Sequence, residues 1–177
     1  EWVQIPAPPD APSGNILGAI MGLTVRDMDA DMKFWGGHLG LEPTGDKNFA
    51  SDAARLDLYG LPRGASYRTM SAVFPGSRAR IEFLEVKGVP RKEFSIRVTD
   101  PGASGMAIRV KKIQDLMATL KKEGIRVSSK NGELVQWSAT IVNVFIKDPN
   151  GLNLELVGTP AGVPAVPFPD AAGDERR

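Results

Sequence analysis

The sequence predicts an α+β protein in which one βαβββ module is built twice. Three observations predict this fold: an internal repeat, an amphipathic helix in each copy, and short strands whose side chains alternate between two kinds of face. With 177 residues, 42% of them hydrophobic, the chain is long enough to bury such a core. We predict an N-terminal Pro-rich arm (1–14), a first module with a linker strand at 94–98 (15–99 in all), a second module (100–158) and a Pro-rich C-terminal tail (159–177).

Composition excludes several classes of function. Lys and Arg number 22 against 21 Asp and Glu, a balance that argues against nucleic-acid and anionic-membrane surfaces. Cysteine is absent, which excludes disulfides, thiolate metal sites and a cysteine nucleophile, and His38 is the only histidine. The first residue is not Met and the start is Pro-rich, which favours an exported (periplasmic or secreted) protein over a cytoplasmic one.

The repeat begins with a strand, a helix and a glycine in each copy. Residues 20–25 read as a strand, and the helix that follows ends at Gly40. Residues 105–110 read as a second strand, and its helix ends at Gly124. From the last valine of the strand to the glycine is 15 residues in the first copy and 14 in the second, so both copies predict the same architecture.

The second half of each copy is a pair of strand-like stretches. Residues 67–74 and 140–146 precede the closing strands, which we place at 80–84 and 153–157. The tetrapeptide at 148–151, Asp-Pro-Asn-Gly, is a strong turn signal just before the last strand.

The two helices are amphipathic. Apolar residues form one stripe on each helix: Met28, Met32, Trp35 and Leu39 in the first, and Ile113, Leu116, Met117 and Leu120 in the second. Asp27 or Asp29 is expected to cap the first helix by accepting its free N–H groups. Gly40 and Gly124 stand where a left-handed C-terminal residue is needed.

Alternation along the strands divides the predicted sheets into two faces. One face is apolar and is expected to pack under the helices. The other, which we call the open face, carries Ile20, Gly22, Thr24, Arg80, Glu82, Leu84, Gly105, Ala107, Arg109, Asn153, Glu155 and Val157. It lines a cavity or faces solvent. Its small residues favour a cavity because they leave room, and its two glutamates recur at the same position of the repeat.

The ordered set of motifs resembles the vicinal oxygen chelate superfamily, the glyoxalase/bleomycin resistance/dioxygenase-like proteins. The motifs are residues 21–27 with Phe34-Trp35 and Leu39-Gly40, then 107–110 with the helix end at 120–124, then 148–156. The resemblance covers residues 16–158. It implies that the two βαβββ modules form a half-open eight-stranded barrel around a cup.

The resemblance also implies positions for a metal site. Enzymatic members hold a divalent cation with one ligand from the first strand and a Glu from the last strand of each module. By motif, the two glutamate positions fall on Glu82 and Glu155. The two first-strand positions fall on Ile20 and Gly105, whose side chains cannot ligate a metal. We therefore expect no cofactor. The alternative is a weakly held Mg²⁺, Mn²⁺, Ni²⁺ or Zn²⁺ on Glu82 and Glu155, which would then be the catalytic residues. His38 is not expected as a ligand, because a helix C-terminus favours histidine without any function.

Six residues are candidate ligand contacts: Arg80, Arg109, Asn153, Thr24, Tyr67 and Arg68. The open-face arginines either replace the missing cation, bind a polar ligand directly, or form ordinary ion pairs. The last two candidates lie in an insertion, because 42 residues separate Gly40 from Glu82 and only 31 separate Gly124 from Glu155. The insertion either closes over a ligand or covers an edge strand.

Three functions stay open at this point. The first is a protein that binds a small polar or aromatic molecule in the cup without the usual two-His/two-Glu metal site. The second is a metal-dependent lyase, isomerase or dioxygenase of the glyoxalase type, so whether the chain is an enzyme is left open. The third is a non-enzymatic partner-binding module. The expected partner is a small molecule, with no nucleic acid and no membrane, and the chain is a monomer or a homodimer.

Overall fold

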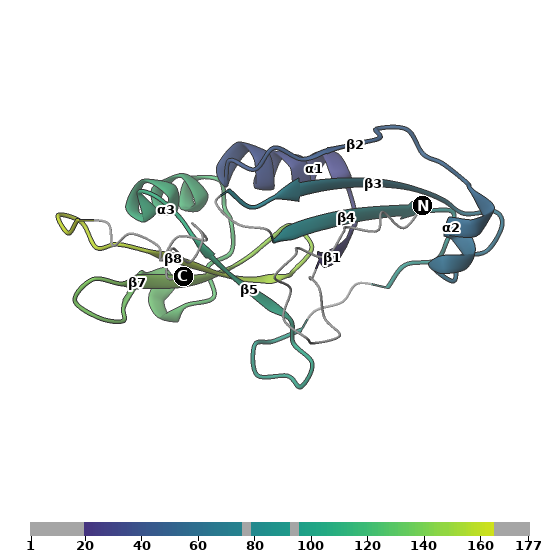
Figure 1. Cartoon of the computed structure of the whole chain (residues 1–177). Coiled ribbons are helices and arrows are strands. Elements are labelled where there is room, and N and C mark those ends of the chain that lie inside the picture. The colour runs from purple at the N-terminus through teal and green to yellow at the C-terminus, as the bar shows by residue number, and fades with distance from the viewer. Residues whose placement is uncertain (1–19, 76–78, 93–95, 165–177) are drawn as a thin grey trace, which may run out of the picture.

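The computed structural model describes residues 20–75, 79–92 and 96–164 (Figure 1). The expected N-terminal arm and residues 165–177 of the expected tail lie outside this part. The first module contains β1 (Ile20–Val25), α1 (Met28–Met32) with a π-helical continuation (Lys33–His38), β2 (Thr44–Gly45), α2 (Ala53–Leu58), β3 (Ser66–Val73) and β4 (Arg80–Lys87). The second contains β5 (Gly105–Arg109), α3 (Ile113–Lys122), a 3₁₀ turn (Lys130–Gly132), β6 (Val135–Gln136), β7 (Val142–Lys147) and β8 (Asn153–Gly158).

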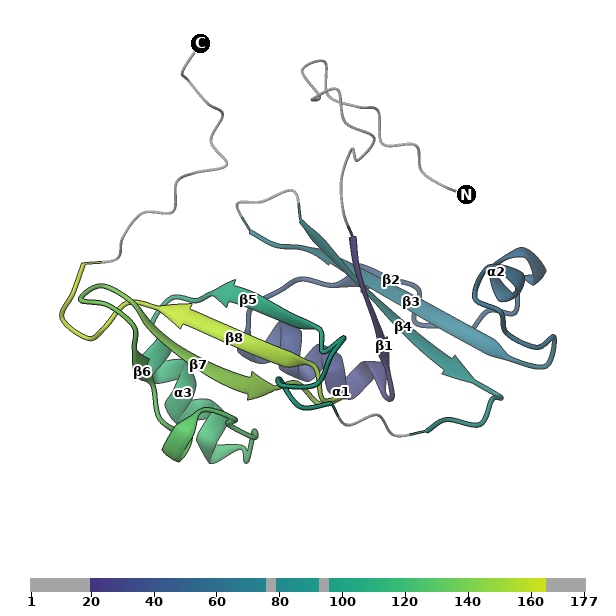
Figure 2. The same ribbon diagram turned by 90° about the horizontal axis from the view of Figure 1, so that it is seen from below.

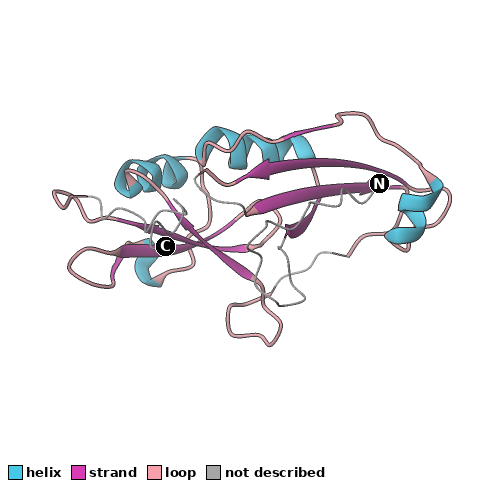
Figure 3. Ribbon diagram, in the orientation of Figure 1, coloured by secondary structure: helices cyan, strands magenta, loops and turns pink. Residues whose placement is uncertain are grey.

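Each module forms one four-stranded mixed sheet. The strand orders are β1-β4-β3-β2 and β5-β8-β7-β6. The first and last strands of each module are parallel neighbours, and the remaining pairs are antiparallel. Helices α1 and α3 lie on the same side of the two sheets (Figure 3), and the opposite side is seen in Figure 2. The predicted α+β fold of two βαβββ modules is confirmed.

The helix ends follow the predicted signals. The side chain of Asp27 caps α1 by accepting hydrogen bonds from the N–H groups of Asp29 and Ala30. Gly40 and Gly124 both adopt positive φ, at 71° and 73°. The first helix differs from the expectation in its second half, where a π-helix contains Gly36 and Gly37, residues of low helix propensity.

Three short elements depart from the sequence expectation. The strands β2 and β6 have two residues each, too few to show alternation. Helix α2 lies in the insertion, for which we named no helix or strand. Of the expected linker strand at 94–98, residues 96–98 lie in no strand, and 94–95 fall outside the described residues.

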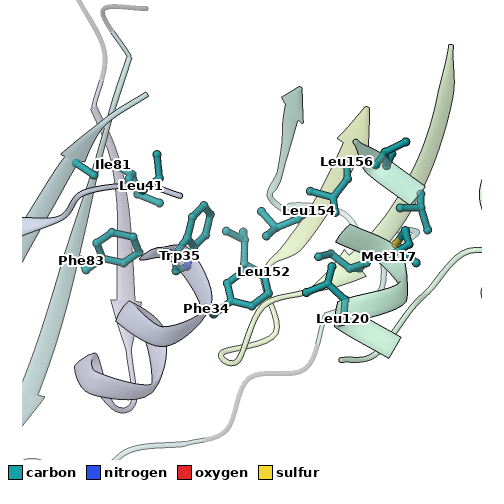
Figure 4. Close-up of a cluster of buried hydrophobic side chains, with 14 of the residues drawn as sticks. Phe34, Trp35, Leu41, Ile81, Phe83, Met117, Leu120, Leu152, Leu154 and Leu156 are labelled. Atoms are coloured by element: carbon teal, nitrogen blue, oxygen red, sulfur yellow. The ribbon is translucent and has the colours of Figure 1, made fainter. Parts of the chain in front are cut away.

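The apolar faces of both sheets meet in one core. Trp35 is fully buried, with its ring 5.5 Å from that of Phe83 in the first sheet. Figure 4 shows Trp35 and Phe34 between Ile81 and Phe83 on one side and Leu152 and Leu154 on the other. The first helix therefore packs against both modules, and the open faces remain on the opposite side of each sheet.

Candidate functional site

Glu82 is the central acidic group of the first open face. It lies on β4 between Gly22 of β1 and Ser71 of β3, its direct partners in the sheet. The residue is half-buried, and it forms no hydrogen bond or ion pair within the described part of the chain. A Cβ added at Gly22 would meet no atom within 4 Å, so the space beside Glu82 is open. Burial raises the pKa of Tyr59, and the charge of Glu82 contributes to the same shift.

Glu155 is its counterpart in the second sheet, in a different environment. It lies on β8 between Ala107 and Phe145. The side chain of Asn143 donates a hydrogen bond of 2.6 Å from Nδ2 to Glu155 Oε1. This bond fixes the orientation of the carboxylate, whereas nothing described holds Glu82.

Two asparagines beside Glu155 carry unsatisfied polar atoms. Asn153 is 3% exposed, and neither its Nδ2 nor its Oδ1 has a partner among the described residues. Asn143 Oδ1 is buried and unpaired in the same way. Asn153 lies opposite Gly105 and Lys147 on the open face. Leaving a buried donor or acceptor unpaired costs about 1–3 kcal/mol, so a polar partner such as an ordered water would stabilise each of these atoms.

The other candidate residues of the open face are placed as follows. Thr24 is exposed on β1, and Arg109 is half-buried on β5. Arg80 is exposed at the start of β4, where it lines an open hollow of about 450 Å³ together with Glu42, Thr44 and Ser71. This hollow carries an acidic group, a basic group and two hydroxyls.

Arg68 lies on the helix-facing side of the first sheet and not on the open face. It stands opposite Glu85 on β4, and its Nη2 is 2.7 Å from Glu85 Oε2. A further contact of 3.3 Å reaches Asp29. Arg68, which we expected as a ligand contact, is engaged in these two ion pairs, and its guanidinium holds α1 to the sheet.

Tyr67 is on the same side as the open face, but it is covered. Its ring is 3% exposed, packs against the ring of Tyr59 at 5.7 Å, and belongs to a small cluster with Leu56 of α2 and Val86. The insertion thus covers the far end of the first sheet, and Tyr67, which we expected as a ligand contact, is buried in the cluster there.

His38 is also removed from the open face. Its Nε2 lies 2.8 Å from Glu123 Oε2 at the end of α3, so this side chain joins the two modules on the helix side.

Sequence reasoning missed three polar residues that the structure places in buried positions or on the open face: Asp31, Glu85 and Asn143. The first two had a signal. Asp31 follows Met28 by three residues on the buried stripe of the helix, and Glu85 continues the alternation of Ile81 and Phe83 on the apolar face. Asn143 gave no signal, because its bond to Glu155 depends on the register of β7 with β8.

Two repeated βαβββ modules, each with a glutamate at the same place on its open face, define a protein of the vicinal oxygen chelate class. The family model described as Glyoxalase/Bleomycin resistance protein/Dioxygenase superfamily matches residues 16–156, and the chain belongs to that superfamily. No curated protein sequence matches the chain.

Solved structures show the same fold at low sequence identity. A glyoxalase family protein from Bacillus cereus has a TM-score of 0.71 at 18% identity, covering 84% of this chain and 99% of that one. A glyoxylase/bleomycin resistance protein/dioxygenase domain from Frankia sp. EAN1pec has a TM-score of 0.54 at 19% identity, covering 86% and 96%. The fosfomycin resistance protein FosX from Mesorhizobium loti has a TM-score of 0.51 at 10% identity, covering 80% and 90%. No helix within the described residues is long and apolar enough to cross a membrane.

Proposed function

We propose that this protein binds a small polar or aromatic molecule on its open faces, without the two-His/two-Glu metal site of its superfamily. The single observation that supports the proposal most is a contrast within that surface. The β1 and β5 neighbours of the two glutamates, Gly22 and Ala107, carry no polar side chain, while polar atoms of Asn153 and Asn143 stay unpaired.

The donor set does not fit a conventional metal centre. Gly22 and Ala107 are the direct β1 and β5 neighbours of Glu82 and Glu155, and Ile20 and Gly105 are the residues one step further along the same face. None of these four side chains has a donor atom. Within the described ranges no three His, Cys, Asp or Glu residues are grouped so that they could hold a metal ion. Two carboxylates alone leave most coordination positions to water.

The residues that remain suit direct recognition of an organic ligand. Glu155, oriented by Asn143, offers an acceptor. Asn153 on the same face has an unpaired donor and an unpaired acceptor, both of them buried. In the first sheet Glu82 and Thr24 offer polar groups next to the open space at Gly22. The open-face arginines Arg80 and Arg109 would favour a ligand that carries some negative charge.

Thermal unfolding with and without Mn²⁺, Ni²⁺, Zn²⁺ and Mg²⁺ tests the proposal. A site held at about 100 times its dissociation constant adds roughly 2.7 kcal/mol, which for this chain length is about 5–10 °C in Tm. We expect no shift of that size. The matched control is the double variant Glu82→Gln/Glu155→Gln, which keeps the shape of both side chains and removes both charges.

The opposite result would identify the second candidate function. A metal-dependent rise in the parent that is lost in the double variant would establish a cation on the two glutamates. The metal-dependent lyase, isomerase or dioxygenase would then replace the ligand-binding protein proposed here.

A further inference from the structure

A polar contact joins the two modules on the helix side of the sheets. Asn150, in the turn between β7 and β8, donates from Nδ2 to Asp31 Oδ1 at 2.6 Å. Its Oδ1 accepts the backbone N–H of Arg26 at 2.8 Å. Both ends of this one amide are therefore bonded to the first module.

The turn that carries Asn150 is held in shape by a buried carboxylate. Asp148 is 4% exposed, and its Oδ1 accepts the N–H groups of Asn150 at 2.9 Å and Leu152 at 2.7 Å. The turn continues directly into β8, the strand of Asn153 and Glu155.

Asp31 is a buried acid with one oxygen free. The residue is 1% exposed, and Oδ2 has no partner in the described part of the chain. Burial raises the pKa of Asp31 from 3.8 to about 7, and the hydrogen bond from Asn150 acts in the opposite direction.

The charged groups around Asp31 do not favour its ionised form. Asp148 from the turn, Asp27 from the helix cap and Glu85 from β4 are carboxylates, and each disfavours a charge on Asp31. Arg68 of β3 is bonded to Glu85, one of these carboxylates. The backbone N–H of Arg26 is bonded to Asn150.

We propose that Asp31 and Asn150 form a proton-controlled clasp between the two modules, closed while the Asp31 carboxyl is neutral and loosened when it ionises. A neutral carboxyl accepts the amide bond without any counter-charge. An ionised one is a buried charge among carboxylates. The Asn150 bond alone favours that charge, but burial is the larger effect, so ionisation favours states in which the turn has moved away and water reaches the carboxylate. The clasp goes beyond the proposed function, because it concerns how the modules are held and not what they bind.

Hydrogen exchange of the Arg26 amide in the intact chain tests the clasp, because this N–H is bonded across the modules. The quantity measured is the protection factor, the exchange rate relative to the intrinsic rate at each pH from 5.5 to 8.5. We expect protection of Arg26 to fall above pH 7, by at most about tenfold per pH unit for release of one proton. The amide of Met28 is the internal control, since it donates to Glu85 Oε2 at 2.9 Å within the first module and should keep its protection.

Two variants complete the test. Asp31→Asn is neutral at every pH and should make the protection of Arg26 independent of pH over this range. Asp115→Asn, which changes an exposed acid in the first turn of α3, should behave as the parent does. Flat protection of Arg26 in the parent, or an equal fall at Arg26 and Met28, would overturn the clasp.

A direct titration covers the case in which Asp31→Asn does not fold. The ¹³C chemical shift of the Asp31 carboxyl is followed by NMR in the parent. A midpoint near 7 together with loss of Arg26 protection over the same pH range supports the clasp, and a midpoint below 5 contradicts it.

Discussion

Arg68 and Glu85 stand directly opposite each other on β3 and β4 and form a buried ion pair, with exposed side-chain fractions of 10% and 5%. The same Glu85 oxygen accepts the backbone N–H of Met28 at the start of α1. The pair therefore joins three elements of the first module, and its two charges are satisfied together.

Replacing Arg68 by Met should destabilise the protein strongly. It leaves Glu85 as a buried charge without its partner, and removing one member of such a pair costs about 3–5 kcal/mol. The matched control is Arg63→Met, since Arg63 pairs with Asp57 at 2.8 Å but both side chains are more than 60% exposed. That change should cost no more than about 1 kcal/mol. Urea unfolding measures both, and equal losses would contradict a structural role for Arg68.

Stability should fall between about pH 4 and pH 7 because of Asp31. Its folded pKa of about 7 lies above the value of 3.8 expected in the unfolded chain, so the folded state binds the proton more tightly. The stabilising contribution is complete below about pH 4 and is lost as pH rises through 7, with an upper limit on the order of 4 kcal/mol.

The comparison with Asp31→Asn isolates this contribution. The unfolding free energy of the variant relative to the parent should rise over the same range and level off above pH 7. Urea unfolding at pH 4.5, 6 and 8 measures it. A difference that shrinks as pH rises would show that the folded pKa of Asp31 is not raised.

The close approach of β8 to α3 predicts that a larger residue at Gly158 lowers stability. A Cβ at Gly158 would lie 2.7 Å from both Cβ and Cγ2 of Ile113, the first residue of α3. Since a β-branched Cβ cannot rotate away, Gly158→Ala should cost roughly 1–3 kcal/mol through overpacking. In Gly22→Ala the new methyl group meets no atom within 4 Å, so stability should change by less than about 0.5 kcal/mol. Thermal unfolding compares the two, and similar melting temperatures would refute the predicted contact.

The sequence predicted those parts of the fold that depend on local pattern. The repeat located both modules, the apolar stripe located α3, and the closing strands were placed at 80–84 and 153–157 where the structure has β4 and β8. Alternation divided these strands correctly into an apolar and an open face. Each of these signals is carried by residues close together in the chain.

What could not be predicted depends on pairing between strands. The face on which Arg68 lies follows from its register with Glu85, a residue just beyond the closing strand as we placed it. The bond between Asn143 and Glu155 likewise needs the register of β7 with β8. Neither the face of Arg68 nor the bond of Asn143 could therefore be predicted, because the sequence located the strands but did not show which residues pair between them.

Because Trp35 is buried against strands of both modules, the duplicated halves share their main hydrophobic core. Each half would expose part of the shared interior if it were produced alone. The chain should therefore melt in one cooperative transition. Separation of the two halves would expose the indole of Trp35 to water and so change its fluorescence.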